Sequence, residues 1–327
     1  KGLLAAGYDR ITLDDCWPSS LRDENGELQG DLTRFAGGIG NLVKRINALG
    51  LKVGIYSSNG TLTCEDLPAS LGNEYRDAYT FAKWGIEFFK YDFCHNVALP
   101  YYAPVVFGAE FTEKGKKEGK FYPCTDARLE GLAKFMPCKK LPTGCFVSGM
   151  DKCRGAMEYN NVYSEEGGEY VLTLYCKKTN SPYEKLAMID INGKRNLCHV
   201  PPQKFWNLTS RFQVEVRLEK GVNKVRIFNP VSSRADSSMR QYLTMGKALK
   251  EATARVAAET GKPEKPIAYS ICEWGKNQPW KWGALAGNMW RTTPDIIPRW
   301  FWIKMIYEKT VKLYGYASAG AYNDPDM

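Results

Sequence analysis

The chain has 327 residues, of which 44% are hydrophobic and 13% aromatic. This is enough apolar material for a packed core, so it excludes intrinsic disorder as the main state, and the length corresponds to about two domains. The 45 basic and 36 acidic residues give a net charge of +9. No nucleic-acid-binding motif accompanies the basic residues, and no apolar run of about 18 residues predicts a membrane span.

The segment from Gly7 to His95 alternates predicted strands and helices. Short apolar runs predict strands at 11–13, 52–57 and 86–92. Apolar residues at helical spacing predict helices at 39–49 and 75–84. Each strand–helix–strand step takes about 35 to 40 residues, the size of a βαβ unit, so a parallel sheet is expected. Ligands bind at the carboxyl ends of such strands.

The pattern then changes to short alternating strands between Tyr122 and Asn229. The alternation is strict over 212–218, and Asn192-Gly193 is typical of a tight turn between strands. This pattern predicts an antiparallel β-sandwich. Helical spacing returns at 239–258 and 300–313, with a buried strand at 267–272. The sequence therefore predicts one β-sandwich inserted into one α/β domain.

The ten cysteines include no Cys-x-x-Cys pair, and the chain has only two histidines. This composition argues against a zinc site and favours disulfides formed in an oxidising compartment. We therefore expect a secreted, extracellular or lumenal protein, although no signal peptide is visible in the sequence.

Acidic side chains recur at predicted strand ends or in the loops that follow, at Asp14, Asp15, Asp92, Glu273 and Asp295. Two carboxylates that face one pocket can hydrolyse an acetal, because one attacks the sugar carbon and the other protonates the leaving oxygen. Nearby aromatic side chains suit the apolar faces of a sugar ring: Trp17, Tyr56, Trp274, Trp282 and Trp290. A single Asp at a strand end is more often a helix cap than a catalyst, so the pattern alone indicates only a candidate sugar site.

Short motifs in the two α/β parts sharpen this interpretation. They are Leu-Asp-Asp-Cys-Trp at 13–17, Gly-Ile-Tyr at 54–56, Thr-Cys at 63–64, Lys-Tyr-Asp-Phe-Cys at 90–94, Ser-Ile-Cys-Glu-Trp-Gly at 270–275, Trp-Arg-Thr-Thr-Pro-Asp-Ile at 290–296 and Asn-Asp-Pro-Asp-Met at 323–327. In this order they resemble the motifs of glycoside hydrolase family 27, the α-galactosidases and their relatives. The resemblance implies a (β/α)8 TIM barrel. The expected domains are a first barrel part at 1–98, an inserted β-sandwich at 99–238 and a second barrel part at 239–327. The family's first strand would precede Lys1 and its eighth would follow Met327, so we expect an incomplete barrel in this chain.

By this resemblance, Asp92 is the nucleophile and Asp295 the acid/base of a retaining enzyme that releases terminal α-linked D-galactose. Lys90 and Arg291 would bind sugar hydroxyls and keep the nucleophile ionised. The other substrate-binding residues that we expect are Asp14, Asp15, Trp17, Tyr56, Cys272, Glu273, Trp274 and Asp326. The bulky residues at 272–274 favour galactose over N-acetylgalactosamine. The resemblance also implies a disulfide between Cys64 and Cys94.

The insert resembles a family 35 type carbohydrate-binding module in its motifs at 125–131, 146–149, 168–175, 191–193 and 218–223. Such modules often carry Ala-Glu for a structural calcium, whereas this chain has Cys124-Thr125, so calcium in the insert stays open. No other metal and no organic cofactor are expected.

The expected partner is a carbohydrate with terminal α-galactose, with no nucleic acid and no membrane, and the oligomeric state is left open. Two alternatives remain: a β-L-arabinopyranosidase or another glycosidase of the same family, and a non-catalytic carbohydrate-binding protein.

Overall fold

The computed structural model describes residues 2–179, 183–202 and 208–326. Contacts divide the chain into two compact units. The α/β unit consists of Lys1–Val97 and Ser238–Met327, and the inserted unit consists of Ala98–Ser237. Within the described residues, no helix is both long and apolar enough to span a bilayer.

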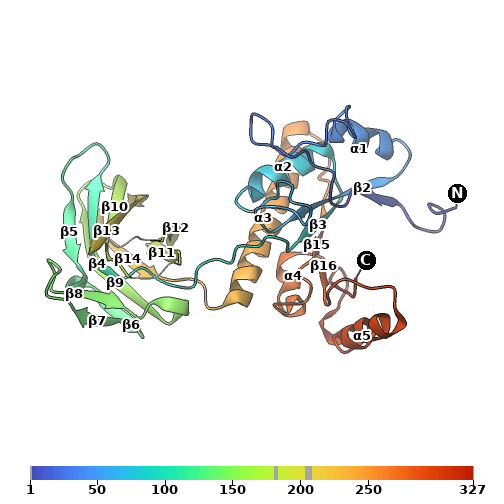
Figure 1. Cartoon of the computed structure of the whole chain (residues 1–327). Coiled ribbons are helices and arrows are strands. Elements are labelled where there is room, and N and C mark those ends of the chain that lie inside the picture. Colours follow the sequence, from blue (N-terminus) through green and yellow to red (C-terminus); the bar gives the residue numbers. More distant parts are fainter. Residues whose placement is uncertain (1, 180–182, 203–207, 327) are drawn as a thin grey trace. The chain divides into compact units, whose positions relative to one another are not determined.

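The α/β unit is built on one six-stranded parallel sheet, part of which is labelled in Figure 1. In spatial order its strands are β1 (Arg10–Thr12), β2 (Lys52–Ser58), β3 (Phe88–Asp92), β15 (Ala268–Ile271), β16 (Met289–Arg291) and β17 (Tyr322–Asp324). The helices of this part of the chain are α1 (Ile39–Asn47), α2 (Glu74–Trp84), α3 (Arg234–Thr260), α4 (Gly283–Ala286) and α5 (Trp300–Val311). Short 3-10 turns lie at η3 (Pro279–Lys281) and η4 (Tyr314–Tyr316).

The predicted strands and helices of the α/β unit are present within a few residues of their expected bounds. Helix α2, for example, ends at Gly85, which has a left-handed φ of 83° that glycine adopts without strain. The described strands form an open sheet whose edges are β1 and β17. Strands β16 and β17, of three residues each, are not among the predicted strands.

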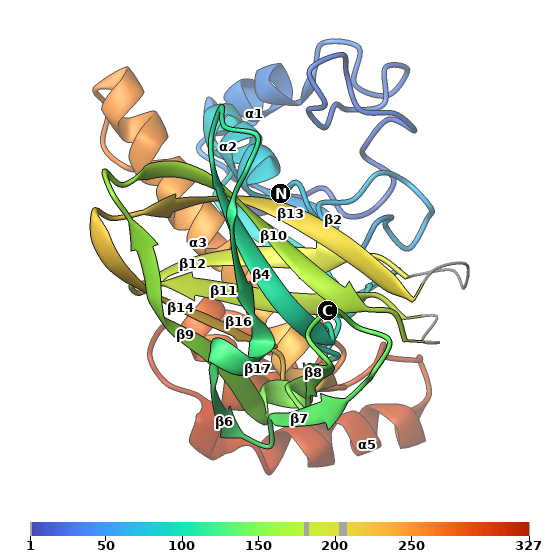
Figure 2. The same ribbon diagram turned by 90° about the vertical axis from the view of Figure 1, so that its left-hand side faces the viewer.

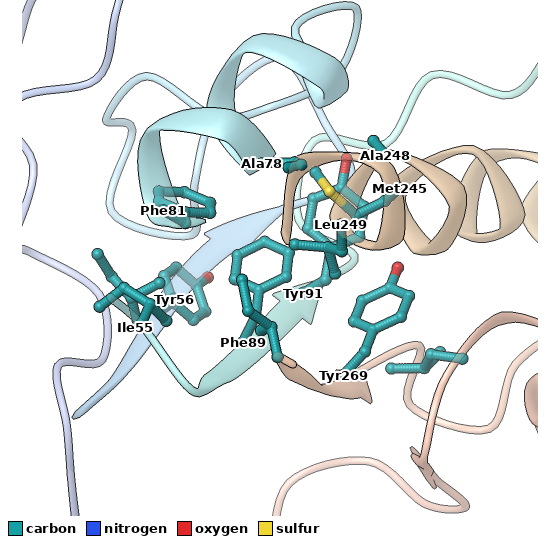
Figure 3. Packing of buried hydrophobic residues seen from close by; sticks show 14 of the residues in the cluster. Ile55, Tyr56, Ala78, Phe81, Phe89, Tyr91, Met245, Ala248, Leu249 and Tyr269 are labelled. Carbon is teal, nitrogen blue, oxygen red and sulfur yellow. The ribbon is translucent and has the colours of Figure 1, made fainter. Parts of the chain in front are cut away.

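One face of the sheet is covered by α2 and α3 through a layer of aromatic side chains (Figure 3). Side chains alternate between the two faces of a strand, and on β3 the residues Phe89 and Tyr91 point toward the helices. The ring of Phe89 lies 5.1 Å from the ring of Phe81 on α2 and 5.9 Å from that of Tyr269 on β15. The layer therefore fixes neighbouring strands and leaves the opposite face for other side chains.

We expect Phe89→Ala to lower the free energy of unfolding by about 3–5 kcal/mol, because it opens a cavity among buried rings. Phe89 is fully buried. Urea denaturation measures the change, and Tyr75→Ala is the control because the Tyr75 side chain on α2 is 47% exposed. A loss for Phe89→Ala as small as that for the control would contradict this packing.

The inserted unit consists of two antiparallel sheets around a core of its own (Figure 2). In spatial order, the first sheet contains β13 (Thr209–Leu218), β10 (Gly168–Lys177), β4 (Val106–Glu113), β8 (Cys145–Ser148) and β7 (Lys134–Pro137), with β5 (Lys120–Pro123) also paired to β4. The second contains β12 (Lys194–Val200), β11 (Lys185–Ile191), β14 (Gly221–Phe228), β9 (Gly155–Ser164) and β6 (Arg128–Gly131). Short 3-10 turns lie at η1 (Cys124–Asp126) and η2 (Asp151–Cys153).

The predicted turn at Asn192-Gly193 joins β11 to β12. Both residues have positive φ values, 52° and 89°, as a two-residue hairpin turn requires. Asp190 then accepts a hydrogen bond from the Gly193 amide at 2.8 Å. The turn residues thus set the register of this hairpin, in which Ile191 lies opposite Lys194.

Candidate active site

A hollow of about 360 Å³ lies on the face of the sheet opposite the aromatic layer. Along each strand, residues that line the hollow alternate with residues that pack on the helices. On β3, Phe88 and Lys90 face the hollow. Five of the predicted site residues line it, namely Asp14, Lys90, Cys272, Arg291 and Asp326. The structure therefore brings together side chains from both chain segments of the α/β unit.

Asp92, the predicted nucleophile, ends β3 and is buried. One carboxylate oxygen accepts a hydrogen bond from the backbone amide of Phe93 at 2.8 Å. Burial raises the pKa of the Asp92 carboxyl, and this effect outweighs the Phe93 amide, Lys90, Cys272 and Arg291, which all lower that pKa. The two cations act in the expected direction, but the net effect of the site is a raised pKa.

Lys90 connects the ends of the first three strands. Its ammonium group lies 3.0 Å from a carboxylate oxygen of Asp14 and 5.2 Å from the centre of the Tyr56 ring. The Lys90 side chain is 8% exposed, whereas that of Asp14 is 47% exposed. Asp14 can therefore receive a ligand from solvent while it is held by a buried cation.

Asp15, the residue that follows Asp14, has other contacts. The Asp15 carboxylate accepts hydrogen bonds from the backbone amides of Cys16 and Glu65, at 2.7 and 3.0 Å. It thus fastens one strand-end loop to the next.

Trp17 and Tyr56, predicted to bind sugar, are both buried. The Trp17 indole donates to the backbone oxygen of Tyr56 at 2.7 Å, and its ring packs edge-on against Trp84 of α2 at 5.9 Å. The Tyr56 hydroxyl donates to the sulfur of Cys64 at 3.3 Å. Trp17 therefore belongs to the helix-side core, and Tyr56 lies beneath Lys90.

Arg291 holds two carboxylates at the end of β16. Its guanidinium lies 2.9 Å from Asp326 and 3.0 Å from Asp295, the predicted acid/base. The side chains of Arg291 and Asp326 are 2% and 6% exposed, whereas that of Asp295 is 82% exposed. The guanidinium also approaches the sulfur of Cys272 at 3.4 Å. A buried cation thus holds one buried and one accessible carboxylate.

The three consecutive residues at 272–274 occupy different environments. Cys272 lines the hollow, whereas Glu273 is fully buried and accepts hydrogen bonds from the Asn277 backbone amide at 2.9 and 3.0 Å. Trp274 has a left-handed φ of 58°, and its ring lies edge-on to Phe93 at 5.9 Å. Glu273 therefore anchors the loop, and Trp274 packs beside the residue that follows Asp92.

Burial raises the pKa of Glu273 from 4.5 to about 7. Because the folded chain holds this proton more tightly than the unfolded chain, the stabilisation is full below pH 4.5 and is lost as the pH rises to about 7, by up to about 3 kcal/mol. We expect Glu273→Gln to flatten this part of the stability profile. Urea denaturation across this pH range measures the slope, with the exposed Glu24→Gln as control. A slope unchanged in Glu273→Gln would contradict the assignment.

The loops that follow β2 and β3 are joined by a disulfide between Cys64 and Cys94, which confirms the predicted pair. Within the described residues, the one group with the spacing of a metal site is Cys64, Asp92 and Cys94. Both of its sulfurs are already committed to the disulfide.

Two further residues of the site were not singled out in the sequence. Asp324 lines the hollow beside Asp326, and burial raises the pKa of its carboxyl. The hydroxyl of Tyr242 on α3 donates to the backbone oxygen of Asp92 at 3.0 Å. The sequence does contain a signal for Asp324, because Asp324 and Asp326 are two residues apart on an extended segment and share a face. It contains no signal for Tyr242, because a buried aromatic residue on a helix usually belongs to the core.

Comparisons with known proteins show similarity to α-galactosidases. Residues 1–103 match the family model described as Alpha galactosidase A. The probable alpha-galactosidase B of Aspergillus oryzae is 30% identical over 328 residues, covering 100% of this chain and 50% of that protein. The first 103 residues therefore match the α-galactosidase family model, and the chain is similar to α-galactosidases along its whole length.

Other relatives extend the comparison. The probable alpha-galactosidase B of Talaromyces emersonii is 52% identical over 95 residues, 28% of this chain and 21% of that protein. Alpha-galactosidase I from Mortierella vinacea shares the fold, with a TM-score of 0.52 and 23% identity over 100% of this chain and 51% of that chain. The chain spans about half the length of the curated relatives that match all of it.

Proposed function

We propose that the protein is a retaining glycoside hydrolase that releases terminal α-linked D-galactose from oligosaccharides or glycoconjugates. The observation that carries the proposal is the environment of Asp92, a buried carboxylate whose pKa is raised by burial and whose ionised form is favoured by the nearby charges of Lys90 and Arg291. The family relationship supports the same reaction, since the curated relatives bear the name α-galactosidase.

In the proposed mechanism, the Asp92 carboxylate attacks the anomeric carbon while Asp295 protonates the leaving oxygen. The carboxylate must be ionised, so the rate should fall at acidic pH from a higher pH than an ordinary aspartate would give. Asp295 then deprotonates a water molecule, which releases the sugar with its original configuration.

The hollow supplies the groups that would hold the sugar. Asp14 and Asp326 offer carboxylate oxygens, and Lys90 and Arg291 offer donors to sugar hydroxyls. The Cys272 side chain occupies the same surface, which we propose leaves room for a free 2-hydroxyl and not for an acetamido group. These reactions use carboxyl groups alone, so we propose no metal or organic cofactor and expect chelator treatment to leave the rate unchanged.

We further propose that the open parallel sheet forms part of a (β/α)8 barrel and that the inserted unit binds carbohydrate. The α-galactosidase fold neighbours support the first of these, and the two-sheet architecture is compatible with the second. The Cys64–Cys94 disulfide supports a secreted or lumenal location.

The test compares p-nitrophenol release from the aryl α-D-galactoside, the aryl β-L-arabinopyranoside and the aryl N-acetyl-α-D-galactosaminide, using the full-length protein. We expect the galactoside to have the highest kcat/KM. Preference for the arabinopyranoside would assign the related pentosidase activity instead. If none is cleaved while an α-galactoside oligosaccharide still binds, the protein is a carbohydrate-binding protein.

A further inference from the structure

Two cysteines of the inserted unit lie side by side without being bonded. The sulfurs of Cys124 and Cys145 are 3.5 Å apart, and the Cys124 sulfur also lies 3.6 Å from the backbone oxygen of Cys145. Cys124 begins η1, directly after β5, and Cys145 begins β8. The two residues are 21 positions apart in the sequence.

Their position in the sheet gives the contact a consequence. Strands β5 and β8 pair end to end with β4, since Pro123 lies opposite Gly108 and Val147 lies opposite Val106. Each strand has four residues, and β8 is registered on β4 at the Val106–Val147 position alone. Two short strands, β5 and β8, therefore pair with successive parts of β4, and the cysteines lie where one of these strands ends and the other begins.

We propose that Cys124 and Cys145 form a second disulfide, which ties β5 and η1 to β8 at this division of the sheet. In the reaction, the two thiols exchange with a low-molecular-weight disulfide such as oxidised glutathione. One sulfur–sulfur bond forms in the protein, the bond of the oxidant breaks, and the oxidant leaves as two thiols that carry the two protons. A cross-link between residues 21 positions apart stabilises the fold chiefly by restricting the unfolded chain.

The different burial of the two cysteines determines the order of the steps in which the disulfide forms. Cys124 is fully buried, and burial together with the Cys145 thiol raises the pKa of Cys124 to about 12. Cys145 is only partly buried, so it is the sulfur that first meets the oxidant. The bond then forms faster during folding, before Cys124 is enclosed, than in the folded reduced protein.

Cys138 is the competing partner for Cys145 that the test must distinguish. Strands β7 and β8 form a hairpin in which Pro137 lies opposite Cys145, and the Cys138 amide donates to the Gly144 oxygen at 2.8 Å. Because successive side chains alternate between faces, Cys138 is on the other face of this hairpin from Cys145. The geometry thus favours Cys124 over Cys138 as the partner of Cys145.

The experiment uses protein expressed in an oxidising compartment, denatured without reductant, treated with iodoacetamide, digested and analysed by mass spectrometry. We expect a peptide pair linked through Cys124 and Cys145, lighter by two hydrogen atoms than the separate thiol peptides. The Cys64–Cys94 bond is the internal control for oxidation. Alkylated Cys124 in protein whose Cys64–Cys94 bond is intact, or a Cys138–Cys145 link, would overturn the proposal.

A second measurement does not depend on digestion. The thermal midpoint of the inserted unit should fall by several degrees when reductant is added, and the Cys124→Ser and Cys145→Ser variants should lose this response. Cys138→Ser, the control, should keep it. An equal response to reductant in Cys124→Ser and in the original protein would contradict the proposal. Neither readout depends on glycosidase activity, so failure of the proposed function would leave this test intact.

Discussion

Asp92→Asn is expected to lower kcat/KM toward an aryl α-D-galactoside by at least about 10³-fold, because the amide cannot attack the anomeric carbon. The substitution keeps the size of the side chain and the position of an oxygen that accepts from the Phe93 amide at 2.8 Å. The variant should therefore fold normally, and circular dichroism with urea denaturation checks this. The exposed Glu118→Gln in the inserted unit is the matched control. Activity in Asp92→Asn close to that of the control would remove Asp92 from the mechanism.

Chemical rescue separates the nucleophile from the acid/base. In Asp92→Gly, added azide would take the place of the missing carboxylate and give the glycosyl azide of inverted, β configuration. In Asp295→Gly, the glycosyl-enzyme still forms from an activated aryl galactoside, and azide would then give the α product. Nuclear magnetic resonance distinguishes the two products. The same configuration from both variants would contradict the assigned roles.

Arg291→Met is the second change with a large expected effect. It leaves the carboxylate of Asp326, 6% exposed, without its buried cation. Removal of one partner from a buried pair costs about 3–5 kcal/mol, so the free energy of unfolding should fall by that amount. Lys304→Met is the control, because Lys304 pairs with Glu308 on the surface at 3.7 Å and such pairs contribute less than about 1 kcal/mol. Equal losses in the two variants would contradict the role of Arg291.

The same substitution has a kinetic signature that lost stability alone would not produce. Arg291 is one of the groups that lower the pKa of Asp92. Its loss raises that pKa, so the acidic limb of the kcat/KM profile should move to higher pH. The profile is measured with the aryl galactoside under conditions where the variant is folded. An acidic limb at the same pH in both proteins would show that Arg291 does not act on Asp92.

Much of the fold could be predicted because local patterns and tertiary packing agree. On β3, Phe89 and Tyr91 alternate with Lys90 and Asp92, so one face enters the aromatic core and the other carries the charged site. Gly85 ends α2 with the left-handed backbone expected of a helix-terminal glycine. Five of the predicted site residues line the hollow because strand ends place them there, and their roles stay predictions.

The remaining site contacts depend on backbone turns that the sequence does not reveal. Trp17 lies near the predicted site in sequence, but its indole is turned into the helix-side core. Glu273 and Trp274 diverge because Trp274 has a left-handed φ of 58°. The pair of Cys124 and Cys145 depends on two short strands meeting on β4, which no local pattern encodes.

The most direct test of the central claim follows the first sugar released from an aryl α-D-galactoside by proton nuclear magnetic resonance, before mutarotation mixes the anomers. The full-length protein is mixed with substrate and the anomeric signals are recorded at early times. A retaining mechanism through Asp92 predicts that α-galactose is released first and that the β anomer accumulates only later. Release of β-galactose first would contradict the double displacement, and the absence of any released galactose would contradict the proposed activity.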